Sequence, residues 1–196
     1  MTLSAGRTRL SRAERRAQLL RTALEVIRTD GVAAVTLSRV AEAAGVSKPV
    51  AYDHFGSADG LLIALYVTID REQGDALRRA LEDEPHDLHS AAARIATTYM
   101  RCCADTAGEG HAIAGALRGN EDMAAAHREL LDGYIDLFVA GLAPHSDLEP
   151  AELRGRCIAL VGAADALAAE MIRGTIAEPA SARTLSAMIA ATLAAA

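Results

Sequence analysis

Three side chains that can donate hydrogen bonds, Lys48, Tyr52 and His54, follow one another at short spacing in the first third of the chain. On a short helix they share the exposed side, from which they could donate to phosphate oxygens or to base edges. Thr36 and Ser47 stand where two helices are expected to begin, and the backbone N–H groups and dipole of a helix N-terminus favour an anion. The pattern therefore indicates contacts with a phosphate-bearing polymer.

Two short helices and a glycine turn must position these donors. Thr36 can cap a helix that runs to about Ala43, and Ser47 can cap a second one, with Pro tolerated in its first turn, that ends near Phe55. Between them Gly45 permits the left-handed backbone that a tight turn often needs. This arrangement is typical of a helix-turn-helix, whose second helix enters the major groove of DNA.

The charge is unevenly distributed along a chain whose net charge is −6. Residues 1–56 carry a net charge of +4, and the remaining residues carry −10. A basic first quarter on an acidic body favours a polyanion partner for the first segment only. The alternative is a solvated basic helix face that has no partner.

A more specific pattern runs from Gln18 to Leu65. It contains, in this order, Gly31, Thr36, Ala41, Ala44, Gly45, Val46, Ser47, Tyr52, His54, Phe55, Ser57 and Leu61. The segment resembles the TetR family of bacterial transcriptional regulators. The resemblance implies a DNA-binding set composed of Thr36, Ser38, Arg39, Ser47, Lys48, Pro49, Val50, Tyr52 and His54. In it, residues 48–50 approach bases, whereas Thr36, Tyr52 and His54 contact phosphates.

The segment also departs from the family pattern. Many members carry Lys or Arg where this chain has Ala58, which puts one phosphate contact in doubt. Tyr52 and His54 have an alternative role in packing and capping within the domain. The arginines before Ser11 could form an arm over the DNA backbone, although chain termini often fray.

The whole chain is predicted to be all-α. It is rich in alanine, the best helix former, and poor in the aromatic residues that favour strands. Periodicity and caps predict about nine helices. Eight of them can be placed, near residues 11–30, 36–43, 47–55, 57–81, 87–105, 120–142, 150–173 and 180–195, and a glycine-interrupted stretch lies before residue 120. We expect a DNA-binding domain over 1–56 and, as the resemblance implies, a helical effector-binding and dimerisation domain over 57–196.

Residues of the second domain that could line an effector pocket are aromatic, sulfur-containing or histidine side chains. They are Tyr66, Tyr99, Met100, Cys103, His111, Met123, His127, Tyr134 and Phe138. Such a stripe at helical spacing is more often plain core than a ligand site. Asp165 is unusual because it interrupts an apolar run, where an ionised group needs a partner or water.

The last two predicted helices carry broad apolar stripes suited to an interface. The stripes contain Leu153, Cys157, Leu160, Val161, Ala164, Leu167, Met171, Leu185, Met188, Ile189 and Thr192. Paired across a two-fold axis, they would form a four-helix bundle between two chains. The alternative is that both stripes pack inside one monomer.

Other function classes find little support in the sequence. No apolar run is long enough for a membrane span and no secretory signal is visible, so we expect a cytoplasmic protein. The three cysteines lack the spacing of a metal site or a disulfide framework, and we expect no metal or cofactor. No nucleotide-binding or hydrolase motif is present, which argues against an enzyme. We expect a homodimeric repressor released from a pseudo-palindromic operator by a small molecule. An activator remains an alternative, as does a helical ligand-binding protein or enzyme without operator binding.

Overall fold

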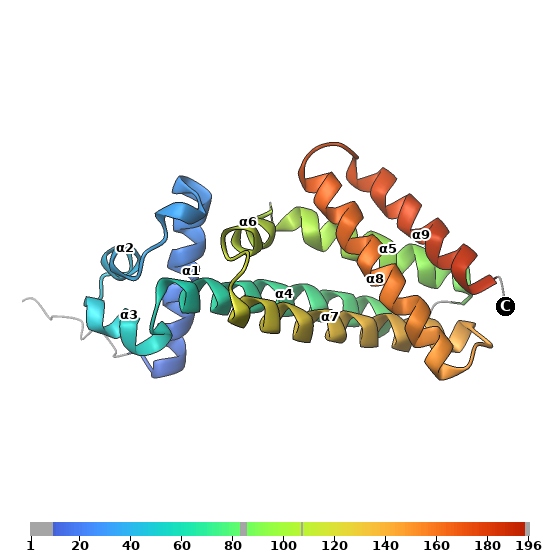
Figure 1. Ribbon diagram of the computed structural model, residues 1–196, viewed down its shortest axis with the longest axis horizontal. Helices are drawn as coiled ribbons and strands as arrows, with labels where there is room; N and C mark the ends of the chain where they lie inside the picture. The colour runs from blue at the N-terminus through green and yellow to red at the C-terminus, as the bar shows by residue number, and fades with distance from the viewer. Residues whose placement is uncertain (1–9, 83–85, 107, 195–196) are drawn as a thin grey trace, which may run out of the picture. The chain divides into compact units, whose positions relative to one another are not determined.

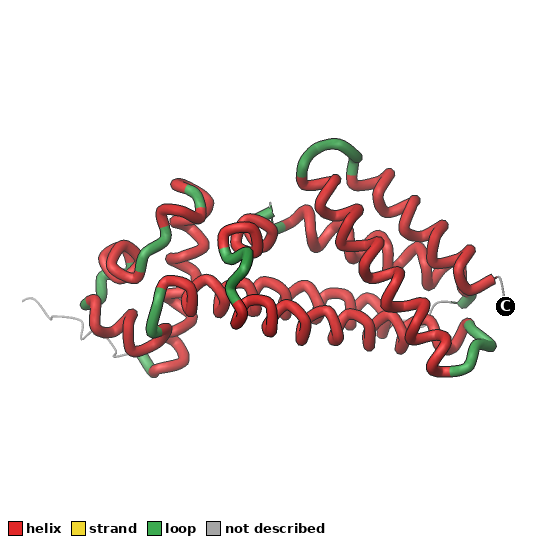
Figure 2. Tube along the Cα trace, in the orientation of Figure 1, coloured by secondary structure: helices red, strands yellow, loops and turns green. Residues whose placement is uncertain are grey.

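The computed structural model describes residues 10–82, 86–106 and 108–194, and every regular element within them is a helix (Figure 2). The α-helices are α1 (Arg12–Asp30), α2 (Leu37–Ala43), α3 (Lys48–Phe55), α4 (Ala58–Glu82), α5 (Leu88–Asp105), α6 (Glu109–Ala116), α7 (Glu121–Leu142), α8 (Pro150–Ile172) and α9 (Glu178–Ala194) (Figure 1). Short 3₁₀ turns follow α1 and α7, at Val32–Ala34 and Ala143–His145. The prediction of an all-α chain with about nine helices is confirmed for the described residues.

The chain packs as two compact units, divided between Leu65 and Tyr66. The division falls inside α4, so one helix contributes to both units. The arginines before residue 10, expected to form an arm, lie outside the described residues. No helix among the described residues has the length and apolar character needed to cross a membrane.

The first unit is built from local signals that the sequence displays. Ser11 and Glu14 form a reciprocal capping box at the start of α1, and the Thr36 hydroxyl accepts a hydrogen bond from the Arg39 N–H at the start of α2. Gly45 adopts a φ of 66°, which lets the chain turn sharply so that the Val46 N–H donates to the Ala41 carbonyl at 2.9 Å. These contacts fix the angle between α2 and α3.

Small and branched apolar side chains make the core of this unit. Leu19, Ala23, Val40, Ala51 and Leu61 are all completely buried. Because Ala51 is small, α3 can approach its supporting helices closely. α1 also holds the turn directly, since the Gln18 side-chain amide donates to the Ala44 carbonyl at 3.1 Å.

The core of the second unit is shared by α5, α7, α8 and α9, together with Leu77 of α4. Alanines on α5 that are fully buried, including Ala92 and Ala96, allow neighbouring helices to pack closely. Phe138 is fully buried and meets the Tyr99 ring edge-on, with ring centroids 6.3 Å apart. α8 and α9 lie side by side, joined by a short connection (Figure 1).

Two local expectations need correction. The glycine-interrupted stretch, to which the sequence pattern assigned no helix, contains the two-turn helix α6, which begins after Gly108 at a φ of 82°. Ser47 precedes α3, but its side chain makes no capping hydrogen bond. Pro49 lies in the first turn of α3, where its missing N–H is one that no intrahelical acceptor would take.

Candidate functional site

The outer face of α3 is open to solvent. Lys48 and Pro49 are exposed, and 52% of Tyr52 is accessible, although an aromatic ring of this size is ordinarily covered. On the opposite side of the helix Ala51 is completely buried. The helix thus presents a cation and a phenol outward on a rigid support, as direct contact with DNA requires.

The hydroxyl groups that precede α2 and α3 differ in their hydrogen bonding. The Thr36 hydroxyl accepts a hydrogen bond from the Arg39 N–H at 3.1 Å. Ser47 is exposed, and its side chain makes no capping hydrogen bond. Ser38 and Val50 are half-buried, so only part of each side chain is accessible. A phosphate at the start of α3 would meet the exposed Ser47 hydroxyl and the positive end of the helix dipole.

Arg39 is engaged within the domain. Its guanidinium lies 2.6 Å from a carboxylate oxygen of Asp30, and both side chains are roughly half exposed. An exposed ion pair of this kind is weak, with a typical value of about 0–1 kcal/mol. A phosphate could therefore replace Asp30 as the partner of Arg39 at small cost.

Arginines at the start of α1 brace the end of α3, a role that the sequence reasoning missed. The Arg16 guanidinium lies 4.7 Å from the centre of the Phe55 ring, and Arg12 donates to the Asp53 carbonyl at 3.2 Å. Half-burial, and then the nearby Arg12 and Arg16 charges, lower the pKa of His54 below its ordinary value. His54 therefore tends toward its neutral form, in which it can donate only one hydrogen bond.

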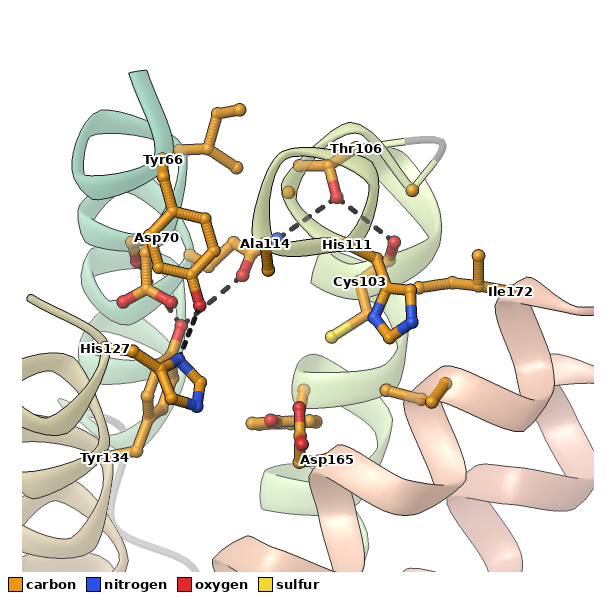
Figure 3. A pocket seen from close by; sticks show the side chains of 17 residues that line it. Tyr66, Asp70, Cys103, Thr106, His111, Ala114, His127, Tyr134, Asp165 and Ile172 are labelled. Atoms are coloured by element: carbon orange, nitrogen blue, oxygen red, sulfur yellow. Dashed lines mark hydrogen bonds between the residues drawn. The ribbon is translucent and has the colours of Figure 1, made fainter. Parts of the chain in front are cut away.

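The second unit contains a cavity of about 220 Å³ (Figure 3). Five helices, α4 to α8, contribute to its wall. Six of the nine predicted pocket residues line it, namely Tyr66, Tyr99, Cys103, His111, His127 and Tyr134. The structure therefore brings together side chains that lie as much as 68 positions apart in the sequence.

The three remaining predicted pocket residues are not in the cavity wall. Met100 and Phe138 are fully buried in the apolar core, and Met123 is also buried, with 5% of its surface accessible. Their helices turn these side chains toward other helices rather than toward the cavity. For them the plain-core interpretation describes the structure.

Hydrogen bonds fix the polar part of the cavity wall. The Tyr66 hydroxyl and His127 Nδ1 share a hydrogen bond of 2.7 Å, and the Tyr134 hydroxyl donates to the Asp70 carbonyl at 3.3 Å. The Gln73 amide donates to the Thr106 hydroxyl at 3.2 Å. These contacts join α4 to α5 and α7 around the cavity.

Burial alters the acid–base properties of this wall. It raises the pKa of Asp70 to about 7, with the charge of Asp165 as a second cause. It also raises the pKa of the Cys103 thiol to about 12 and that of the Tyr66 hydroxyl above its ordinary value. Cys103 is thus a neutral thiol and not a reactive thiolate at neutral pH.

Two carboxylates of the cavity were absent from the predicted pocket. Asp70 follows Tyr66 by four residues on α4, so helical spacing already placed them on one face. Asp165 was noticed as a charge in an apolar run, and in the structure it lines the cavity from α8. Gln73 and Thr106 also line it without having been predicted.

The apolar stripes of α8 and α9 lie mostly inside one chain. Fully or almost fully buried members are Leu153, Cys157, Leu160, Val161, Ala164, Leu185 and Ile189, all in the core of the second unit. Leu167, Met171 and Thr192 are half-buried, and Met188 is 40% exposed. The buried members cannot contact a second chain in this structure, because α5 and α7 already cover them.

Comparisons with known proteins agree with this geometry. Residues 19–65 match the family model of bacterial regulatory proteins, tetR family. The HTH-type transcriptional activator FasR of Mycolicibacterium smegmatis is 49% identical over 57 residues, which are 29% of this chain and 26% of FasR. The matched segment thus spans about a quarter of the length of that relative.

Solved structures share the fold over nearly the whole chain. A TetR-like transcriptional regulator from Rhodococcus sp. RHA1 superposes with a TM-score of 0.70 at 24% identity, covering 96% of this chain and all of its own. The fatty acid degradation regulator FadR from Bacillus halodurans gives a TM-score of 0.70 at 18% identity, over 93% of this chain and 97% of its own. Residues 19–65 thus match the tetR family of bacterial regulatory proteins, and the solved structures share the fold of nearly the whole chain.

Proposed function

We propose that this protein is a ligand-responsive, DNA-binding transcriptional regulator of the cytoplasm. Residues 1–56 form the DNA-binding domain in this proposal, and residues 57–196 form the effector-binding and dimerisation domain. The observation that carries it is the open face of α3, where Lys48, Pro49 and Tyr52 are exposed while Ala51 is buried beneath them. An α-helix presented in this way fits the major groove.

A homodimer would place two such helices on one operator. In helix-turn-helix dimers the half-sites lie about 34–36 Å apart, so the operator is a pseudo-palindrome. We propose that the dimer forms through the outward faces of α8 and α9, where Ile158 is 53% and Met188 40% exposed. Small exposed residues beside Ile158, such as Gly155, Ala159 and Gly162, would let two helices approach closely.

The cavity gives the proposed regulator a place for its effector. α4 supplies Tyr66, Asp70 and Gln73 to this cavity, and the same helix supplies Leu61 to the core of the first unit. A ligand that shifts α4 would change the separation of the two recognition helices and release the operator. Coupling of this kind is typically worth about 1–3 kcal/mol.

Transcription in vitro from the DNA upstream of the protein's own gene tests the proposal. The native chain should reduce the transcript, and a chain with Lys48→Ala and Tyr52→Ala should not. Arg128→Ala, which removes an exposed positive charge on α7, serves as the matched control and should act like the native chain. Equal transcript with and without native protein on this and on sequence-selected templates would contradict the proposal.

Activation is the second candidate because FasR, a relative that is 49% identical over 57 residues, is named an activator. The match covers 29% of this chain and 26% of FasR, so it does not fix the direction of regulation. The same transcription assay separates the two, since an activator increases the transcript and a repressor decreases it.

A further inference from the structure

The cavity of the second unit has an unusual balance of charge. Asp70 of α4 and Asp165 of α8 both line it, and no lysine or arginine is among the described residues of its wall. Figure 3 shows the two carboxylates approaching the cavity from different helices. Asp70 is half-buried and Asp165 is exposed, so the negative charge of Asp165 acts on a carboxylate that is already partly desolvated.

The electrostatic effect of this arrangement is visible on Asp70. Its pKa rises to about 7, first because it is buried and second because Asp165 is nearby. The other titratable groups of the wall are neutral phenols and a thiol, Tyr66, Tyr99, Tyr134 and Cys103, and the histidines His111 and His127. His127 already shares its Nδ1 with the Tyr66 hydroxyl, so it is not fully free to compensate a carboxylate.

The rest of the wall suits the apolar part of a ligand. Three tyrosine rings approach the cavity, and Tyr99 and Tyr134 pack edge-on with centroids 5.5 Å apart. Ile69, Ala168 and Ile172 add aliphatic surface. Aromatic rings attract cations through their negative faces, whereas an anion would meet both carboxylates without a fixed positive charge. No three His, Cys, Asp or Glu side chains among the described residues gather to hold a metal ion.

We propose that this cavity binds a small organic cation, an amine or quaternary ammonium on an apolar body, with Asp70 and Asp165 as the groups that recognise its charge. The assignment rests on the proposed function, because it names the chemical class of the effector for that site. The volume of about 220 Å³ lies below the range of about 300–1,000 Å³ that is usual for drug-sized ligands. A compact ligand is therefore expected.

Three probes that share one skeleton test the charge requirement. 2-Phenylethylammonium, 2-phenylethanol and phenylacetate are cationic, neutral and anionic at pH 8, and each is titrated calorimetrically into the full chain. The cation should bind at least about tenfold more tightly than the alcohol, since a hydrogen bond to a charged group contributes about 1.5–3 kcal/mol. Phenylacetate should bind most weakly of the three.

Neutral substitutions then assign the carboxylates. Asp70→Asn and Asp165→Asn should each weaken the cation about tenfold or more while leaving the affinity for 2-phenylethanol unchanged. Asp132→Asn removes an exposed carboxylate of α7 that is not in the wall, and should change neither affinity. Circular dichroism and thermal unfolding of each variant verify that it is folded.

Several results would overturn the assignment. They are failure of the cation to bind, an alcohol or phenylacetate affinity equal to that of the cation, and unchanged cation binding in both carboxylate variants. DNA binding by the same samples is measured separately. Cation binding without any DNA binding would refute the proposed function and leave the cavity assignment standing. DNA binding without cation binding would refute the cavity assignment and leave the proposed function standing.

Discussion

The two units present their functional side chains in opposite ways. In the unit that ends at Leu65, Lys48 and Tyr52 stand exposed on a helix of eight residues, which the Gly45 turn and the buried Ala51 hold in place. In the unit that begins at Tyr66, the corresponding side chains face inward from five helices. The difference teaches that spacing along one segment can locate a surface site, whereas a cavity depends on how distant helices pack.

The largest effect should come from the core of the second unit. Phe138→Ala removes a fully buried ring, and such changes typically lower the free energy of unfolding by about 3–5 kcal/mol. Urea denaturation measures this loss. Phe138→Leu, which keeps most of the volume, should cost less than about 1.5 kcal/mol. A small effect of the alanine variant would mean that Phe138 faces a space that the core does not fill, and would break the contrast between core and cavity.

In the first unit we expect substitution of an exposed side chain to lower DNA affinity and to leave stability almost unchanged. Tyr52→Ala should leave stability within about 0.5 kcal/mol of the native value, because the side chain is exposed. Affinity for the operator should nevertheless fall by about 1–3 kcal/mol, measured by fluorescence anisotropy. Tyr52→Phe separates the hydroxyl from the ring. Loss of stability with unchanged DNA affinity would show instead that Tyr52 packs within the domain.

The backbone at the start of α4 packs closely around Gly60, and substitution of this glycine tests that close packing. A Cβ at Gly60 would lie 2.3 Å from the Phe55 carbonyl oxygen, so Gly60→Ala should cost about 1–3 kcal/mol of stability. Gly133→Ala in α7 is the matched control, because its Cβ would meet open space. That control should stabilise the chain by about 0.5–1 kcal/mol. Equal effects of the two substitutions on thermal unfolding would contradict the close approach.

The smallest predicted effect concerns Asp70 and pH. Its pKa of about 7 lies above the ordinary value of 3.8, so the native state keeps the proton longer than the unfolded state. Stability is therefore lost as pH rises from about 4 to about 7, and Asp70→Asn removes that loss. Because Asp70 is partly solvated, we expect the variant to be about 1–2 kcal/mol more stable at pH 8.

Thermal unfolding of the native chain and of Asp70→Asn across this pH range provides the measurement. The gap between them should close as the pH falls below about 4, where Asp70 becomes protonated in both states. Asp132→Asn should follow the native curve throughout. A gap that does not depend on pH would show that the variant acts through packing and not through ionisation.

The sequence predicted the first unit well because its signals are local. Ser11, Thr36 and Gly45 each specify a cap or turn within a few residues, and the structure contains these features. The ion pair of Arg39 with Asp30 and the contact of Arg16 with Phe55 were missed, since they join separate helices.

The second unit was predicted less completely. Helical periodicity shows that Phe138 and His127 face inward, yet it does not distinguish a packed core from a cavity wall. Likewise the stripe containing Leu153 and Leu185 was assigned to an interface, and it lies in the core of one chain because α5 covers it. Asp70 could have been found from its spacing of four residues to Tyr66.

The central claim is that α3 reads a specific DNA sequence, and the ratio of two affinities tests it most directly. Binding to the upstream duplex and to a scrambled duplex is measured over a series of salt concentrations, for the native chain and for Lys48→Ala with Tyr52→Ala. The native chain should prefer the upstream duplex by at least about a thousandfold, with affinity falling steeply as salt increases. In the variant this preference should collapse toward one. A native chain that binds every duplex equally, including those from a broad sequence selection, would contradict the account.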